Sequence, residues 1–377
     1  MDPLDAGVLP DGIRSRFLCD INGLRVHVLE AGDADKPGLL LLHGFPELAY
    51  SWRHVMLPLA DAGFHVFAPD LRGYGRTTRA ETDYDGDLAS YRRFNIVRDV
   101  LGVVAAMHCR TVAVVGHDFG SPIAAWCAVL RPDVFTAVAL MSAPFRGPPR
   151  LSEGDQHGTD SGASLFDDLA ALKRPRKHYQ QYYQTREANP NMWRAPQGVH
   201  DFLRAYYHVK SADWPRNRPF RLAGRSAAEM AKMPTYYVMD AADGMAETVA
   251  KHMPSPRAVA ANMWLPDAEL AVYAAEYERT GFQGGLNHYR SGAIGLAEQQ
   301  LFAGRGIEQP STFISGTADW GVYQSPGAVE RMRDEVCTDF RGVHLVEGAG
   351  HWVQQEQPVE TARLLVDFLH GAGQGRA

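Results

Sequence analysis

The sequence has few cysteines and no excess of positive charge. Its 377 residues include four cysteines, which lie far apart without metal-ligand spacing, and the formal net charge is −6. A net negative charge does not indicate a basic surface that would bind nucleic acid or an anionic membrane. We therefore expect a cytoplasmic protein with reduced thiols, among them a partly buried Cys19 and Cys127, and with no metal or nucleic-acid partner.

Long apolar runs are also missing. No uninterrupted stretch approaches the roughly 18 residues that a membrane-spanning helix needs. Residues 1–16 carry acidic side chains and lack the apolar centre of a signal peptide. Hydrophobic residues still make up 45% of the chain, which is enough for a large core. These features predict a soluble globular protein without membrane contact, and they assign no oligomeric state.

What the sequence does contain is a repeated alternation of apolar runs and helical patterns. Strands are predicted over residues 13–21, 24–29, 38–42, 63–69, 111–115, 135–141, 311–315 and 342–346. Helices are predicted over residues 52–62, 91–107, 121–130 and 359–369. Apolar strands that alternate with helices are typical of a mostly parallel sheet covered on both faces, which is an α/β architecture.

The middle of the chain has a different character. Residues 146–163 are rich in Gly, Pro, Asp and Ser and are predicted to form a linker. Residues 165–289 show aromatic-rich helical segments without strand alternation. We therefore predict a core formed by residues 1–145 and 296–377, interrupted by a helical cap domain over residues 146–295. This cap would lie over the strand ends as a lid.

One stretch between a predicted strand and a predicted helix has the layout of a nucleophile elbow. Residues 116–120 read Gly-His-Asp-Phe-Gly, and a nucleophile elbow holds its central side chain on a strained turn flanked by glycines. The familiar central residue is serine, but here it is Asp118. Asp118 has an alternative role as the cap of the following helix. We favour the nucleophile because of two residues further along the chain.

These residues supply the base and the orienting acid that such a nucleophile needs. Asp319 lies in the loop after one predicted strand, and His351 lies in the loop after the next. The order Asp118, Asp319, His351 matches the nucleophile, acid and histidine order of α/β-hydrolases. Backbone N–H groups of Phe45, after the strand at 38–42, and of Phe119 are predicted to form the oxyanion hole.

A carboxylate nucleophile favours attack on a saturated carbon. Serine would leave a stable ether there, whereas aspartate leaves an ester that water, activated by His351, hydrolyses. Epoxides and alkyl halides are the candidate electrophiles. An epoxide oxygen needs acidic O–H donors such as tyrosine, and a halide prefers N–H donors such as tryptophan. Phe119, which follows the nucleophile, has no N–H in its side chain.

At this point the chain resembles the soluble type of epoxide hydrolases in the α/β-hydrolase superfamily. The resemblance rests on His-Gly-Phe-Pro-Glu at 43–47, Asp-Leu-Arg-Gly-Tyr-Gly at 70–75, the elbow at 116–120 and Gly-His-Trp at 350–352. It is also carried by the lid segments at 178–184 and 281–290.

The resemblance implies an α/β-hydrolase fold with a cap and assigns roles to further residues. Tyr179 and Tyr289 would bind the epoxide oxygen and protonate the alkoxide, with Tyr182 and Tyr183 as lower-ranked rivals for the role of Tyr179. Glu47 and His117 would position water. One departure is Phe119, because many members carry tryptophan after the nucleophile.

The sequence thus predicts a cofactor-independent epoxide hydrolase that converts a small-molecule epoxide and water to a vicinal diol through an aspartyl ester. One alternative is a haloalkane or haloacid dehalogenase with the same Asp-His-Asp triad. A second is a non-catalytic ligand receptor with a hydrolase fold. A serine-type esterase is disfavoured, because the elbow has no hydroxyl.

Overall fold

The fold is built on one large, mostly parallel sheet. The computed structural model describes residues 1–151 and 160–374. In this sheet the strands lie in the order β1-β2-β4-β3-β5-β6-β9-β10. Their bounds are β1 (Arg14–Ile21), β2 (Leu24–Ala31), β3 (Gly38–Leu42), β4 (His65–Pro69), β5 (Val112–His117), β6 (Phe135–Met141), β9 (Ile307–Gly316) and β10 (Cys337–Val346).

The strand directions match the predicted α/β class. β1 and β2 form an antiparallel hairpin at one edge, and β2 also runs antiparallel to β4. All remaining neighbours are parallel. Every residue of β3, β4 and β5 is buried, as expected for strands that are covered on both faces. The mostly parallel, doubly covered sheet is therefore confirmed.

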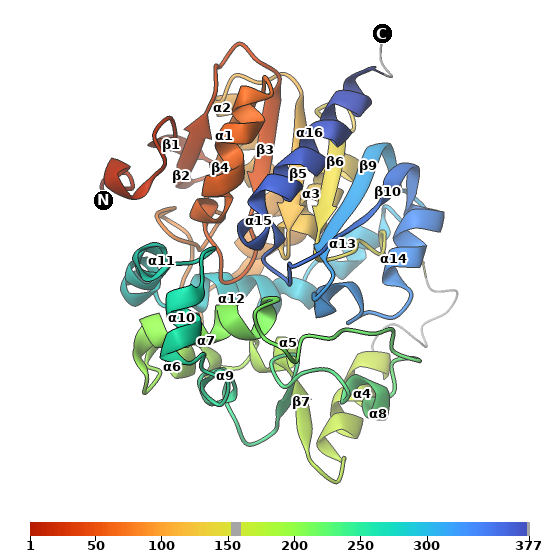
Figure 1. The fold of residues 1–377 in the computed structure, drawn as a ribbon. Helices are drawn as coiled ribbons and strands as arrows, with labels where there is room; N and C mark the ends of the chain where they lie inside the picture. Colours follow the sequence, from red (N-terminus) through yellow and green to blue (C-terminus); the bar gives the residue numbers. More distant parts are fainter. Residues whose placement is uncertain (152–159, 375–377) are drawn as a thin grey trace.

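Helices cover both faces of this sheet. α1 packs against α16 on one face, and α2 packs against α3 on the other (Figure 1). The helices around the sheet are α1 (Arg53–Asp61), α2 (Arg93–Ala106), α3 (Gly120–Leu130), α14 (Ala328–Arg331), α15 (Val353–Glu356) and α16 (Pro358–Gln374). Short 3-10 turns are η1 (Ala6–Val8), η2 (Ala49–Trp52), η3 (Leu88–Tyr91), η4 (Ser291–Ala293) and η5 (Trp320–Val322), and η6 (Met332–Val336) is a π-helical turn.

Residues 160–300, here called the inserted segment, join β6 to β9 and are mainly helical. Figure 1 shows most of this segment, in green and cyan, below the sheet, at the end where β5 leads into α3. Its helices are α4 (Asp160–Ala170), α5 (Tyr179–Tyr182), α6 (Ala188–Trp193), α7 (Gly198–Lys210), α8 (Ala227–Met230), α9 (Met245–Ala250), α10 (Pro256–Ala261), α11 (Asp267–Thr280), α12 (Gln283–Arg290) and α13 (Leu296–Gln300).

Several details differ from the sequence predictions. β9 and β10 begin at Ile307 and Cys337, before the predicted starts at 311 and 342, and α4 begins at Asp160, inside the predicted linker. The inserted segment contains a two-stranded antiparallel ribbon, β7 (Arg176–His178) with β8 (Val238–Asp240), whose strands are too short to show alternation. Cys19 is exposed, because it lies on the edge strand β1, whereas Cys127 is buried. α16 extends beyond the predicted end at residue 369 to Gln374. Part of the predicted linker, residues 152–159, lies outside the described residues.

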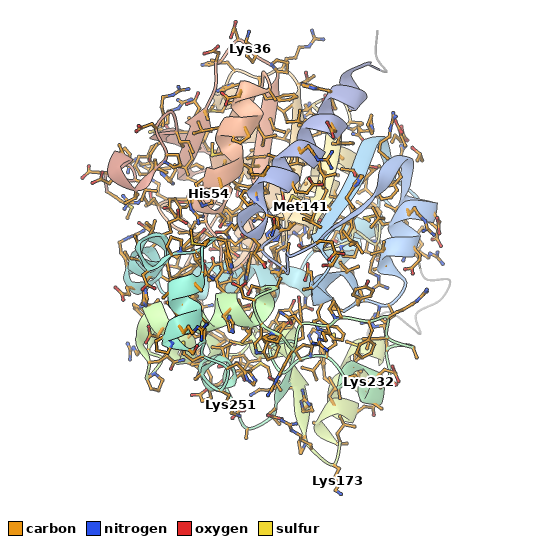
Figure 2. All side chains as sticks on the ribbon, in the orientation of Figure 1. Lys36, His54, Met141, Lys173, Lys232 and Lys251 are labelled. Atoms are coloured by element: carbon orange, nitrogen blue, oxygen red, sulfur yellow. The ribbon has the colours of Figure 1, made fainter. Side chains whose placement is uncertain are left out.

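The sheet meets the inserted segment near the centre of the molecule. Figure 2 shows Met141, the last residue of β6, at this level, while Lys36 and Lys173 lie at opposite ends of the view. Buried side chains form one continuous hydrophobic core through both regions. The predicted division into a core and a cap domain at residues 146 and 295 stays a prediction.

Candidate active site

Asp118 lies at the sharp turn between β5 and α3. Its φ of +49° falls in the left-handed region that side chains other than glycine rarely adopt. A Cβ atom on Gly116 would lie 2.2 Å from the Gly120 carbonyl oxygen, and one on Gly120 would lie 2.2 Å from the Leu42 carbonyl oxygen. The two glycines of the elbow are therefore required for its close packing.

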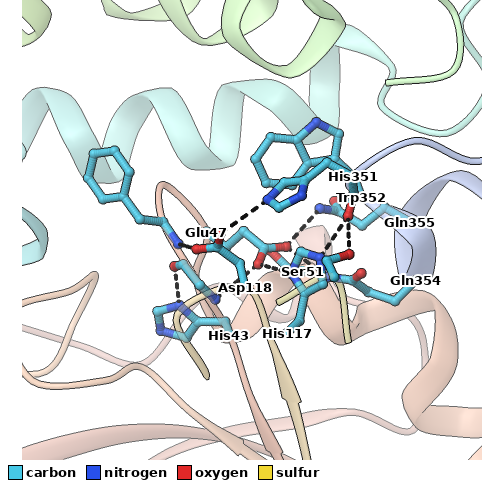
Figure 3. Close-up of polar contacts among 12 residues, drawn as sticks. His43, Glu47, Ser51, His117, Asp118, His351, Trp352, Gln354 and Gln355 are labelled. Atoms are coloured by element: carbon cyan, nitrogen blue, oxygen red, sulfur yellow. Dashed lines mark hydrogen bonds and ion pairs between the residues drawn. The ribbon is translucent and has the colours of Figure 1, made fainter. Parts of the chain in front are cut away.

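His351 brings the predicted triad together. Its Nδ1 lies 3.1 Å from Asp319 Oδ1. Its Nε2 lies 3.2 Å from Asp118 Oδ2, a contact that Figure 3 shows. The Nε2 contact has ion-pair distance but not the alignment of a hydrogen bond, which leaves Nε2 able to act on another group. His351 and Asp319 are each 1% exposed. Residues from three separate strand ends thus meet in a region shielded from solvent.

Asp319 is fixed by its own hydrogen bonds. Ser315 Oγ donates to its Oδ2 at 2.8 Å, and the Gly321 N–H donates to its Oδ1 at 2.7 Å. Burial favours the neutral acid, but the His351 charge and these hydrogen bonds outweigh it and lower the pKa of Asp319. Asp319 therefore remains an anion that orients the imidazole.

The same electrostatics set the charge of the other two members. Burial opposes a charged His351, yet the Asp319 charge and the contacts with both carboxylates raise the pKa of His351 to about 9. Burial also opposes a charged Asp118, but its contact with His351 and the charges of Lys210 and His117 hold the pKa of Asp118 well below its usual value. At neutral pH, Asp118 is a carboxylate beside an imidazolium.

The predicted oxyanion donor Phe45 contacts the nucleophile directly. Its backbone N–H donates to Asp118 Oδ1 at 2.9 Å. The preceding Gly44 packs so closely that a Cβ atom there would lie 2.3 Å from Asp118 Cβ. Oδ1 is thus held by a backbone donor, and Oδ2 faces His351. The second predicted donor, the Phe119 N–H, follows Asp118 in the chain, and its role stays a prediction.

Glu47 and His117 form a buried pair beside the triad. His117 Nδ1 lies 2.5 Å from Glu47 Oε2, and His117 Nε2 lies 2.7 Å from the His351 carbonyl oxygen. Both partner atoms are acceptors, so both contacts are hydrogen bonds only when the ring is doubly protonated. Gln354 and Gln355 donate to Glu47 Oε1 (Figure 3). The pair links the loop of Phe45 to the loop of His351, and its predicted water-positioning role stays a prediction.

Asp118 opens into a cavity of about 380 Å³ that Tyr179 and Tyr289 also line. The two tyrosine rings lie 6.2 Å apart, centre to centre. Burial, and after it the charge of Asp118, raises the pKa of both phenols well above the usual value, so both stay protonated. Gln180 donates to the Tyr179 hydroxyl at 3.1 Å.

The rival tyrosines, Tyr182 and Tyr183, are not among the residues that line this cavity. Tyr182 lines a different cavity on the inserted segment, and its hydroxyl is buried without a hydrogen-bond partner among the described residues. Tyr183 donates its hydroxyl proton to the Tyr206 hydroxyl at 3.0 Å. The geometry therefore favours Tyr179 over both rivals.

Comparison with known proteins identifies the family to which this chain belongs. The alpha/beta hydrolase fold family model matches residues 37–358. Epoxide hydrolase A of Mycobacterium tuberculosis is 33% identical over 362 residues, which cover 96% of this chain and 98% of the relative. Epoxide hydrolase B of the same organism is 32% identical, covering 94% of this chain and 98% of its own. The chain belongs to the epoxide hydrolase family of alpha/beta hydrolases.

Solved structures of epoxide hydrolases share the whole architecture. An epoxide hydrolase from an endophytic Streptomyces is 32% identical, with a TM-score of 0.77 over 96% of both chains. Potato (Solanum tuberosum) epoxide hydrolase I is 30% identical, with a TM-score of 0.73 over 95% of this chain and 99% of its own. Such coverage includes the inserted segment as well as the sheet.

Two charged residues of this epoxide hydrolase site have no counterpart in the sequence predictions. Lys210 is 3% exposed, and its ammonium lies over the rings of Tyr206 and Tyr237 at 5.2 and 5.1 Å. Its carbonyl oxygen accepts the His351 N–H at 2.9 Å. Arg93 lines the same cavity as Asp118. Lysine and arginine usually lie at the surface, so no local pattern marks Lys210 as buried or Arg93 as lining a cavity.

Neither metal-binding nor membrane-spanning features occur in residues 1–151 and 160–374. Within these ranges no group of three or more His, Cys, Asp or Glu side chains could hold a metal ion. No helix there is long and apolar enough to cross a membrane.

Proposed function

We propose that this protein hydrolyses an epoxide to a vicinal diol through a covalent ester on Asp118. The observation that carries the proposal is the position of the Asp118 carboxylate. One oxygen receives the Phe45 N–H, the other faces His351, and the cavity beyond is lined by two protonated tyrosines. This arrangement supplies a nucleophile, a base and acidic O–H donors around one space.

In the first half-reaction, Asp118 Oδ2 attacks one carbon of the epoxide ring. The carbon–oxygen bond breaks, its electron pair stays on the ring oxygen, and Tyr179 or Tyr289 donates a proton to that oxygen. Asp118 loses its charge on becoming an ester. His351 then has one carboxylate beside it, Asp319, in place of two. The pKa of His351 therefore falls, and its imidazolium gives a proton to the tyrosinate.

In the second half-reaction, neutral His351 takes a proton from water, and the hydroxide attacks Cγ of the ester. The developing oxyanion is Oδ1, which the Phe45 N–H already contacts and which the Phe119 N–H would also bind. The tetrahedral intermediate then collapses and expels the alkoxide of the diol, which takes the proton of the new carboxylic acid. This restores the Asp118 carboxylate beside protonated His351. The two steps together consume one epoxide and one water and require no cofactor.

The inserted segment would act as the cap in this scheme. It supplies both tyrosines, from α5 and α12, whereas the triad comes from the loops of the sheet. We propose the division at residues 146 and 295 on this basis. The free cysteines accord with the predicted cytoplasmic location.

A dehalogenase with the same triad is the second candidate, because halides are also displaced by a carboxylate. Phe119 offers the leaving group no side-chain N–H, and the two phenols suit an epoxide oxygen better. Incubation with styrene oxide and, separately, with a chloroalkane tests the choice. Diol formation without halide release supports the proposal. Halide release without diol would establish the dehalogenase, and no turnover of any epoxide would favour a receptor.

A further inference from the structure

Arg93 is the positive group of the cavity that contains the nucleophile. It is the first residue of α2, is partly buried and lines the same cavity as Asp118. Its guanidinium carbon lies 5.2 Å from the centre of the Phe119 ring. That ring lies 5.0 Å from the ring of Tyr289. The Phe119 ring thus contacts both the Arg93 guanidinium and Tyr289, a tyrosine that is proposed to bind the epoxide oxygen.

The charge of Arg93 is stabilised by a cation–π contact with the Phe119 ring. Within the described ranges Arg93 forms no ion pair, whereas buried Arg72 binds Asp99 with two N–H groups at 2.7 Å each. A partly buried charge without an ion pair is costly, and a cation at the start of a helix opposes the helix dipole. Burial lowers the pKa of Arg93 to about 10, which still leaves it charged at neutral pH.

Arg93 and the other residues that line the cavity would orient an anionic substrate. Among the described residues that line the cavity, the charged ones are Asp118 and Arg93, and the polar neutral ones include Gln180, Gln184 and Gln324. A substrate with an anionic end would be attracted by Arg93 and repelled by Asp118. It would therefore bind with its neutral epoxide end toward the nucleophile.

We propose that the substrate is an epoxide that also carries a carboxylate, and that Arg93 binds this carboxylate with its paired N–H donors. Planar guanidinium and carboxylate groups match in a two-bond contact, which fixes orientation as well as position. The inference rests on the proposed epoxide hydrolysis and adds the class of substrate. Arg93 then acts as a specificity-determining residue that takes no part in bond making or breaking.

The test uses matched pairs of substrates. A homologous series of epoxy carboxylates, which differ in the number of methylene groups between ring and carboxylate, is compared with the corresponding neutral primary amides. For at least one chain length, kcat/KM of the carboxylate should exceed that of the amide by about 10- to 100-fold, the effect of one charge-assisted contact. Arg93→Met should remove this preference, so that the ratio of the two kcat/KM values falls to about 1, while Arg93→Lys should keep part of it.

Arg92 offers a matched control on the same helix end. It pairs with Glu298 at 3.1 Å and does not line the cavity, so Arg92→Met should preserve the preference. Equal kcat/KM for carboxylates and amides in the wild type, or the same preference in Arg93→Met, would overturn the inference. In that case neutral epoxides would still be hydrolysed. Failure to hydrolyse styrene oxide as well would instead reject the proposed function.

Discussion

Replacing His351 by glutamine should separate the two half-reactions. Ring opening needs the Asp118 carboxylate and the phenols, whereas ester hydrolysis needs a base on water. His351 Nε2, at 3.2 Å from Asp118 Oδ2, is the base beside the ester carbon. Loss of a general base slows its step by roughly 10²- to 10⁴-fold. We therefore expect His351→Gln to form the ester and hydrolyse it slowly, so that the ester accumulates.

Intact-mass spectrometry after mixing with styrene oxide provides the assay. Ring opening expels no leaving group, so the adduct should carry the full mass of one epoxide, and a peptide map should place it on Asp118. His370→Gln, on the exposed end of α16, is the matched control and should turn over without an adduct. Absence of any adduct in His351→Gln, with the epoxide unconsumed, would refute the two-step reasoning.

Three further predictions concern the phenols, the elbow and the charge of His351. Tyr179→Phe combined with Tyr289→Phe should lower epoxide turnover by roughly 10²-fold or more, because no O–H remains to protonate the alkoxide. Tyr182→Phe is the control. Near-normal turnover of the double variant would reject the assignment of the two tyrosines. Gly44→Ala would place a Cβ atom 2.3 Å from Asp118 Cβ. It should lower the free energy of unfolding, measured in urea, by about 1–3 kcal/mol and turnover by about 100-fold. Unchanged kinetics would contradict the geometry. The pKa of His351 is raised from 6.5 to about 9, so its stabilising contribution is complete below pH 6.5 and is lost as the pH rises through 9. The stability difference between wild type and His351→Gln should therefore fall by about 3 kcal/mol across this window in urea titrations, and a difference independent of pH would show that His351 is not charged.

The central sheet was predictable because its strands carry strong local signals. β3 and β6 are continuous apolar runs, and their predicted bounds match the structure at both ends. The triad was accessible for a related reason. Parallel strands place the loops at their carboxyl ends along one edge, so the positions of Asp118, Asp319 and His351 after β5, β9 and β10 implied proximity.

Other features depend on long-range packing that the sequence does not display. Strands β7 and β8 have three residues each, which is too few for a periodic pattern. Lys210 ends an amphipathic helix and would ordinarily extend into solvent, yet four aromatic rings surround its ammonium. Arg93 is the first residue of α2, and only the assembled fold brings it to the cavity of Asp118.

The source of the oxygen in the first turnover tests the covalent mechanism most directly. Enzyme in excess of an epoxide reacts once in water enriched in oxygen-18, and both the diol and the peptide that contains Asp118 are analysed by mass spectrometry. The mechanism predicts an unlabelled diol, whose new oxygen comes from the Asp118 carboxylate, and one labelled oxygen in Asp118. A labelled diol with unlabelled Asp118 would show that water attacks the epoxide directly and would contradict the account.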